Sequence, residues 1–309
     1  MGAPRLWAIV GATGTGKTAL SLDLAEELIR RGRGAEIINA DAMQLYRGMD
    51  IGTAKVPVAE RRGIPHHLFD EFEVTEDVAV AVYQERARAA IQDVFDRGSD
   101  AILVGGSGLY VSSVVFDFRF PPRDPALRTR LEADLAEQGS SALIDRIRGI
   151  DPAAADRLDP RNSRRVVRAL EVVLQGAETH GAALPDAPVL WHPDTVLVGV
   201  HLDRATLVGR LDERVQGMWC DGILAEVDSL RSHGLESGPT APRAIGYAQA
   251  LAQLAGRMTE AEAIAETQAL TRRYARRQVS WFRRYPDIRW VDAGTPAARL
   301  VEDFPAPNA

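Results

Sequence analysis

A glycine-rich segment near the N-terminus has the residue types and spacing of a phosphate-binding loop. It matches the pattern G-x-x-x-x-G-K-[S/T] with Gly11, Ala12, Thr13, Gly14, Thr15, Gly16, Lys17 and Thr18. An apolar stretch precedes it and a stretch with helical periodicity follows it, which is the strand–loop–helix context that the pattern requires. Backbone N–H groups can surround phosphate oxygens there, Lys17 adds a positive charge, and the Thr18 hydroxyl can bind Mg²⁺. The segment therefore predicts a site for a diphosphate or polyphosphate.

One carboxylate stands where it can act on whatever approaches that phosphate group. Residues 35–40 form a strand-like segment, and Asp41 follows at once. In a doubly wound sheet this places Asp41 beside the P-loop, where it can accept a proton from an incoming nucleophile. The next strand-like segment, residues 101–104, runs into Gly-Gly-Ser-Gly without the acid that holds Mg²⁺ in motor and switch NTPases. A kinase, or an enzyme from which a diphosphate leaves, fits this pattern better.

The elements that must position these residues alternate between strands and helices. After Phe120 the pattern changes at Pro121 and Pro122, and residues 124–175 have an arginine-rich helical pattern. Strand and helix patterns return from Thr195 onward. The sequence therefore predicts an α/β fold with a P-loop, doubly wound parallel sheet core. The expected domains are a core of residues 1–120 plus 195–309 and a mostly helical insertion of residues 121–194.

Composition limits the protein class. The 309 residues are 46% hydrophobic and 26% charged, and no apolar run reaches the roughly 18–20 residues of a membrane span. The N-terminus lacks an apolar region with a cleavage site, so we expect no signal peptide. The single cysteine, Cys220, cannot form an internal disulfide, and we interpret it as a helix-packing residue in a reducing compartment. We expect a cytoplasmic monomer without membrane contact.

Lysine is rare in this chain. All but two of the 37 basic residues are arginine, and the two lysines are Lys17 and Lys55. A compact ammonium and a planar guanidinium are not equivalent in a tight space. Both positions are therefore candidates for sites where arginine is not tolerated, although the sequence does not indicate which charge Lys55 meets.

Four stretches, in this order and spacing, closely resemble the bacterial tRNA dimethylallyltransferases. They are residues 11–18, residues 39–55 (NADAMQLYRGMDIGTAK), residues 103–110 (LVGGSGLY), and residues 242–247 (PRAIGY) together with 272–282 (RRYARRQVSWF). The resemblance covers nearly the whole chain. It implies transfer of a dimethylallyl group from dimethylallyl diphosphate to N6 of the adenosine 3′ of the tRNA anticodon, with Mg²⁺ as cofactor. The P-loop would then hold a leaving group.

The resemblance also implies residue roles. Asp41 would be the general base, while Lys17, Ser107 and Arg243 would stabilise charge on the departing diphosphate. Ser107 stands where the family usually has threonine, so it keeps the hydroxyl but loses the methyl that restricts its rotamer. Contacts with the tRNA anticodon stem-loop, with Gln44 as a reader of base edges, would come from Asp41, Ala42, Met43, Gln44, Ser107, Arg128, Arg164, Arg165, Val166, Val167 and Arg168.

Two other functions stay open at the level of sequence. One is a small-molecule or nucleotide kinase that uses ATP and has Asp41 as its base. The other is a tRNA-binding protein that retains a P-loop without transfer chemistry. The adjacent His66 and His67 suggest a metal site, but adjacent side chains point in different directions and no Cys/His cluster lies nearby in sequence, so we expect a structural role.

The strongest local charge lies near the C-terminus. Residues 270–290 contain seven arginines and one aspartate, a net charge of +6 in a chain of net charge −6. Arg272, Arg273, Arg276 and Arg277 have helical spacing, which suits an RNA backbone track, a solvated helix face or a lid over phosphates.

Replacing Arg272, Arg273, Arg276 and Arg277 by Ala should weaken tRNA binding. Each arginine that no longer contacts a phosphate reduces the number of counterions that the tRNA releases when it binds. The affinity should also become less dependent on salt. Binding measured over a series of salt concentrations tests this, and an unchanged salt slope would assign the helix to another task.

Overall fold

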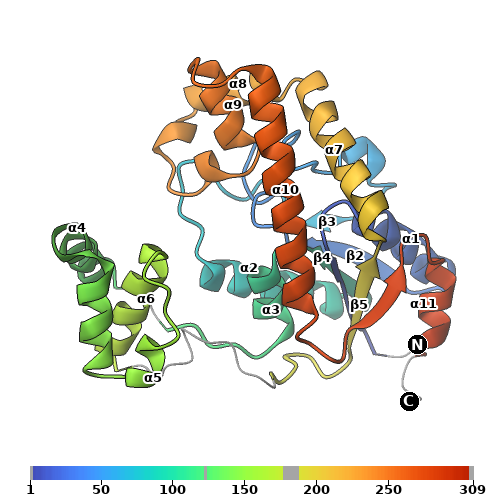
Figure 1. Cartoon of the computed structure of the whole chain (residues 1–309). Helices are drawn as coiled ribbons and strands as arrows, with labels where there is room; N and C mark the ends of the chain where they lie inside the picture. The colour runs from blue at the N-terminus through green and yellow to red at the C-terminus, as the bar shows by residue number, and fades with distance from the viewer. Residues whose placement is uncertain (1–2, 122–123, 177–187, 306–309) are drawn as a thin grey trace. The chain divides into compact units, whose positions relative to one another are not determined.

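The computed structural model describes residues 3–121, 124–176 and 188–305 (Figure 1). The chain divides into two compact units. The larger comprises Met1–Val115 with Trp191–Ala309, and the smaller comprises Phe116–Leu190. The sequence placed the insertion over residues 121–194, a few residues further along the chain. Each unit is described by itself below.

A six-stranded sheet forms the centre of the larger unit, and all of its strand pairs are parallel. The strand order is β3-β2-β4-β1-β5-β6. The inner strands are almost continuously apolar because helices cover both faces of a parallel sheet. This confirms the predicted α/β fold. The strands are β1 (Leu6–Gly11), β2 (Gly34–Asn39), β3 (His66–His67), β4 (Ser99–Gly105), β5 (Thr195–His201) and β6 (Arg289–Asp292).

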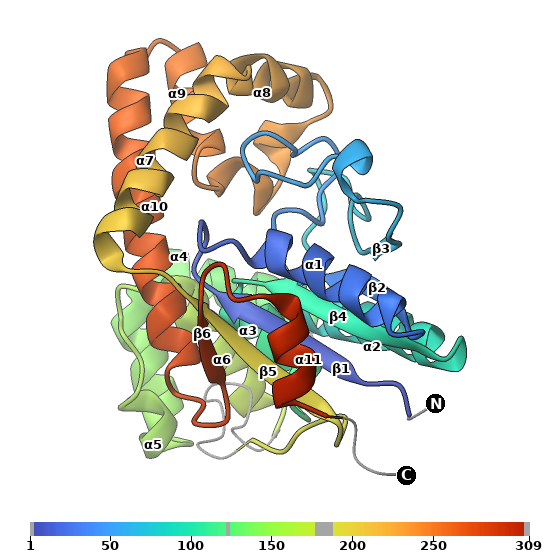
Figure 2. The same cartoon turned by 90° about the vertical axis from the view of Figure 1, so that its right-hand side faces the viewer.

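Successive strand residues point to opposite faces, so each face has its own helices. Trp7, Ile9 and Ile102 join a core with α1 (Lys17–Arg30) and α11 (Ala297–Asp303). Two further helices, α2 (Val80–Asp96) and α3 (Gly108–Val115), pack on β4 and on neighbouring strands from the other side (Figure 2). The carboxyl ends of the strands are left for the loops that carry the site.

Four helices from the second half of the chain pack on one another within the larger unit. They are α7 (Arg204–Cys220), α8 (Ile223–Ser232), α9 (Tyr247–Leu254) and α10 (Glu260–Phe282). Local signals fix their starts. Asp203 accepts from the Thr206 N–H at the head of α7, and Thr259 forms a capping box with Glu262 at the head of α10.

The smaller unit is helical and has its own apolar core. It contains α4 (Pro125–Arg148), α5 (Pro152–Ala155) and α6 (Ser163–Leu174). Gly149 caps the end of α4, and Pro152 begins α5. A further bend inside α4, at Gly139 (φ 78°), has no counterpart in the sequence prediction.

The fold bears on the expectations for membrane spans and for Cys220. No helix in the described part of the chain is both long enough and apolar enough to cross a bilayer. The interpretation of Cys220 as a packing residue is wrong, because its side chain is exposed where α7 ends.

Candidate active site

The helix that follows the P-loop, α1, begins with backbone donors that no side chain caps. Gly16 precedes α1 with a left-handed φ of 91°, and no side-chain cap or acidic residue occupies the first turn. The first amides of a helix lack internal partners and carry the positive end of its dipole, so they are available to an anion. The Lys17 ammonium donates to the Ala12 carbonyl at 2.7 Å, and the Thr15 hydroxyl donates to the same oxygen at 2.9 Å.

Glycines bring the ends of three strands together. The sequence placed Asp41 directly beside the P-loop, but β4 lies between β2 and β1. Gly105 and Gly106 at the end of β4 let the flanking chains approach closely, because a Cβ at Gly105 would overlap the Ala40 carbonyl after β2 and one at Gly106 would overlap the Gly11 carbonyl at the end of β1. Their role is therefore close backbone approach.

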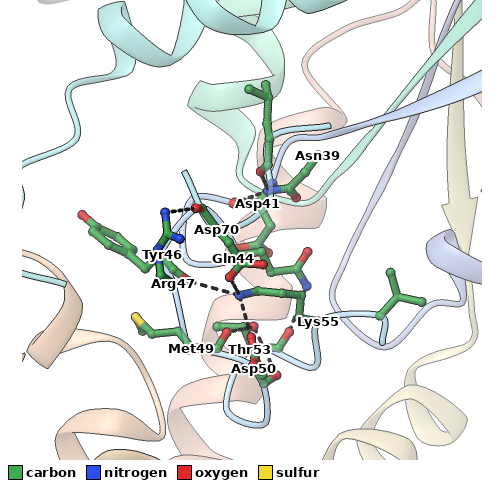
Figure 3. Close-up of polar contacts among 12 residues, drawn as sticks. Asn39, Asp41, Gln44, Tyr46, Arg47, Met49, Asp50, Thr53, Lys55 and Asp70 are labelled. Atoms are coloured by element: carbon green, nitrogen blue, oxygen red, sulfur yellow. Dashed lines mark hydrogen bonds and ion pairs between the residues drawn. The ribbon is translucent and has the colours of Figure 1, made fainter. Parts of the chain in front are cut away.

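Asp41 is held by its neighbours at the end of β2. Its N–H donates to Asn39 Oδ1 at 2.9 Å, and its Oδ1 accepts from the Met43 N–H at 2.9 Å (Figure 3). The buried Ser107 hydroxyl accepts from the Ala42 N–H at 3.3 Å and lies 3.4 Å from the Tyr274 hydroxyl. These contacts hold the Ser107 side chain in one orientation. In a threonine the methyl group would restrict the rotamer instead.

Arg214 on α7 joins the site, and the sequence reasoning missed it. Its Nη1 lies 3.3 Å from Thr13 Oγ1, and its Nη2 donates to the Thr53 carbonyl at 3.1 Å. Arg214 belongs to no motif. The sequence offers one indication of its role. Helical spacing places Arg214 on the same face of α7 as the buried apolar residues Leu211, Val215 and Met218, where a charged residue is unusual.

Three charges influence one another beside the P-loop. The pKa of Lys17 is lowered to about 8, chiefly by desolvation; the Asp41 carboxylate offsets part of this effect, and the Arg214 charge adds a smaller lowering. Desolvation also lowers the pKa of Arg214, again opposed by Asp41. An anion placed among two desolvated cations gains more from them than it would in water.

The inner face of α10 completes the site. Gln278 is buried and its Oε1 accepts from the Thr13 N–H at 2.8 Å. Burial raises the pKa of Tyr274, and the Asp41 charge adds to this effect. The predicted RNA-binding residues of α10 are its arginines. The residue of α10 that contacts the P-loop is Gln278, on the buried face of the helix.

Lys55 organises the loop that follows Asp41 (Figure 3). Its buried ammonium contacts Asp50 Oδ1 and Asp70 Oδ1, each at 2.6 Å, and donates to the Tyr46 carbonyl at 3.0 Å. Three acceptors match the three N–H donors of an ammonium, and a planar guanidinium would not reproduce this arrangement. This explains in physical terms why lysine persists here.

Comparisons with known proteins address the family. A family model described as IPP transferase matches residues 44–285. A tRNA dimethylallyltransferase of Clavibacter sepedonicus is 58% identical over 93% of this chain and 92% of its own, and one of Kineococcus radiotolerans is 49% identical over the full length of both. The chain belongs to the tRNA dimethylallyltransferase family.

Solved structures of this family have the same fold. The tRNA isopentenylpyrophosphate transferase of Bacillus halodurans gives a TM-score of 0.69 at 36% identity, covering 97% of this chain and 95% of the other. A eukaryotic dimethylallyltransferase acting on tRNA gives a TM-score of 0.81 at 26% identity, covering 99% and 81%.

The smaller unit contains several of the residues that were predicted, from the family resemblance, to contact tRNA. Arg164 and Arg165 are exposed on α6. Val166 and Val167 are buried in that unit's core, because α6 turns this apolar face inward, and their contact with tRNA stays a prediction. The fifth, Arg168, lies 2.9 Å from the buried Glu171, and Arg128 lies 3.8 Å from the same carboxylate.

The remaining predicted residues lie in the larger unit. Arg243 is exposed at the end of a 3₁₀ turn, Ala241–Arg243, so its convergence with Ser107 stays a prediction. Arg272 pairs with Asp212 across α7 and α10, whereas Arg273, Arg276 and Arg277 are exposed. A variant in which only Arg273, Arg276 and Arg277 are replaced by Ala therefore tests RNA binding while the Arg272–Asp212 ion pair is kept.

The two histidines lie on the edge strand β3. His67 Nε2 lies 2.7 Å from Glu36 Oε2, and His66 Nδ1 lies 2.7 Å from the Ile64 carbonyl. Both contacts join β3 to its own surroundings in the larger unit.

The pKa of Lys17 predicts a pH dependence for anion binding. Below pH 8 the ammonium is charged in the free protein, and above pH 8 binding of a diphosphate must take up a proton, so its affinity should fall. Calorimetry with inorganic diphosphate from pH 7 to 9 measures this. The ratio of wild-type to Lys17→Met affinity cancels the ligand's own titration. A ratio that stays constant over this range would contradict the prediction.

Proposed function

We propose that the protein transfers the dimethylallyl group of dimethylallyl diphosphate to N6 of the adenosine 3′ of the anticodon in tRNAs. Membership of the tRNA dimethylallyltransferase family supports the reaction class. The observation that supports the proposal most is that the Lys17 ammonium lies on the P-loop, at 2.7 Å from the Ala12 carbonyl, where the Asp41 charge raises its pKa.

The reaction needs a base and a stabilised leaving group. The adenine N6 lone pair is delocalised into the ring, so N6 is a weak nucleophile. As N6 attacks the allylic carbon, the C–O bond breaks and its electron pair leaves with the diphosphate. Asp41 accepts the N6 proton. Lys17, Arg214 and the uncapped amides of α1 stabilise the negative charge that builds on the leaving group.

Mg²⁺ fits this donor set when the diphosphate supplies most of its ligands. Within the described residues no group of three or more His, Cys, Asp or Glu side chains could hold a metal ion. Thr18 is exposed in the first turn of α1 and offers a hydroxyl. Mg²⁺ commonly takes few protein ligands, several waters and substrate phosphates. When bound, it would neutralise charge on the diphosphate.

RNA recognition follows from the same loop. Reaching N6 requires the adenine to leave its stack, which is easier in a single-stranded loop than in a duplex. Gln44 follows Asp41 closely, and its Nε2 already donates to the Thr53 carbonyl at 3.1 Å. We propose that this bond orients the amide for reading a base edge. A cytoplasmic location is part of the proposal, since the lone Cys220 requires no oxidising compartment.

Product mass tests the function directly. Incubation with dimethylallyl diphosphate, Mg²⁺ and unmodified tRNA should add one C5H8 unit to one adenosine, measured by mass spectrometry of the digested tRNA. Phosphorylation of a small molecule without prenylated tRNA would establish a kinase instead. Binding of tRNA without any transfer would establish an RNA-binding protein.

Asp41→Asn separates the base from the binding machinery. The amide oxygen can still accept from the Met43 N–H, so binding of tRNA and diphosphate should stay near normal. Because general-base catalysis is typically worth about 10²–10⁴ in rate, kcat should fall by that factor in single-turnover assays. A kcat within about threefold of wild type would show that Asp41 is not the base.

A further inference from the structure

Glu226 on α8 is enclosed by hydrogen-bond donors from the loop after β2. Its Oε2 accepts from the N–H groups of Asp50 at 3.1 Å and Ile51 at 2.7 Å. Its Oε1 accepts from the Gly52 N–H at 3.3 Å and from the Tyr247 hydroxyl at 2.5 Å. Successive backbone N–H groups of this kind form an anion-binding concavity. Here a carboxylate of the protein itself occupies it.

The turn at residues 50–52 is also fixed by packing. A Cβ at Gly52 would overlap the Tyr247 ring, so the turn lies directly on that ring. Tyr247 is fully buried, and burial together with the Glu226 charge raises its pKa. The hydroxyl therefore stays protonated and donates to the carboxylate.

The Thr53 carbonyl, directly after this turn, accepts hydrogen bonds from two side chains near the site. Thr53 O accepts from Arg214 Nη2 at 3.1 Å and from Gln44 Nε2 at 3.1 Å. Arg214 also reaches Thr13 of the P-loop, and Gln44 follows the proposed base closely. A shift of the turn would therefore displace an arginine near the diphosphate site and an amide near the RNA site together.

The loop around this turn does not adopt its shape without cost. Two residues linked to it have left-handed backbone angles without being glycine: Ala54 in the same loop (φ 48°) and Asp70, which pairs with Lys55 (φ 59°). Such residues persist only where their surroundings hold them. Lys55 supplies one fixed point through Asp50 and Asp70. Glu226, from a different element, supplies another.

We infer that Glu226 is a positioning residue for the transfer reaction. It holds the 50–52 turn so that the Thr53 carbonyl orients Arg214 and Gln44 at the same time. This inference rests on the proposed function but assigns Glu226 no contact with either substrate. It predicts that disturbing the turn raises KM for both substrates, a pattern that a loss of stability alone does not produce.

Glu226→Gln is the first test. One of its two terminal atoms becomes an NH₂ group that faces backbone N–H groups or the Tyr247 hydroxyl, so the turn must move. Each KM should rise and each kcat/KM should fall by about tenfold or more, because small misplacements near reacting groups have effects of this size. Asp228→Asn makes the same chemical change on the exposed face of α8 and should leave both constants at wild-type values.

Two variants test the turn without changing charge. Gly52→Ala pushes it away from Tyr247 and should reproduce the rise in both KM values. Tyr247→Phe removes one of the four donors and should give a smaller rise of the same kind, with the fold retained. If the folded variants keep wild-type KM for both substrates and differ only in melting temperature, Glu226 is structural and the inference is wrong. If wild-type protein prenylates no tRNA, the proposed function itself fails, a separate outcome.

Discussion

The close approach of three strand ends is the constraint on which the site depends. In the order β2-β4-β1 the loop with Asp41 and the P-loop are separated by a whole strand. They meet because β4 ends in Gly105 and Gly106, which leave no Cβ between the flanking chains. A glycine pair that would otherwise weaken a strand thus lets the Asp41 charge act on Lys17.

Once these groups are close, their surroundings set their charges. Partial exclusion of water from Lys17 and Arg214 disfavours their positive charges, and Asp41 offsets only part of this cost. A diphosphate would relieve it. In the proposed reaction the same carboxylate would hold the N6 proton once the diphosphate has left. The arrangement suits a reaction in which an anion departs, because the positive groups surround the leaving group and not the nucleophile.

The loop from Asp41 to Lys55 connects this chemistry to the rest of the larger unit. It forms no helix or strand, so its shape comes from side chains that reach into it. Lys55 draws Asp50 and Asp70 together, and Glu226 binds the amides between them. A lysine suits the first task because its three donors are arranged around one atom, whereas an arginine spreads its donors in a plane.

The sequence by itself determined the α/β fold, the strand–loop–helix context of residues 11–18 and the family, since these follow from local periodicity and from motifs whose residues are contiguous. It also singled out Lys55, but not the charges that Lys55 meets. Only the tertiary structure decided that Arg214 and Gln278 reach the P-loop and that Glu226 holds the 50–52 turn, because each comes from a helix distant in sequence from the group that it contacts. It also decided that Val166 and Val167 point inward and that Arg272 is paired with Asp212. Burial and long-range pairing depend on how helices pack, which residue spacing within one helix does not specify.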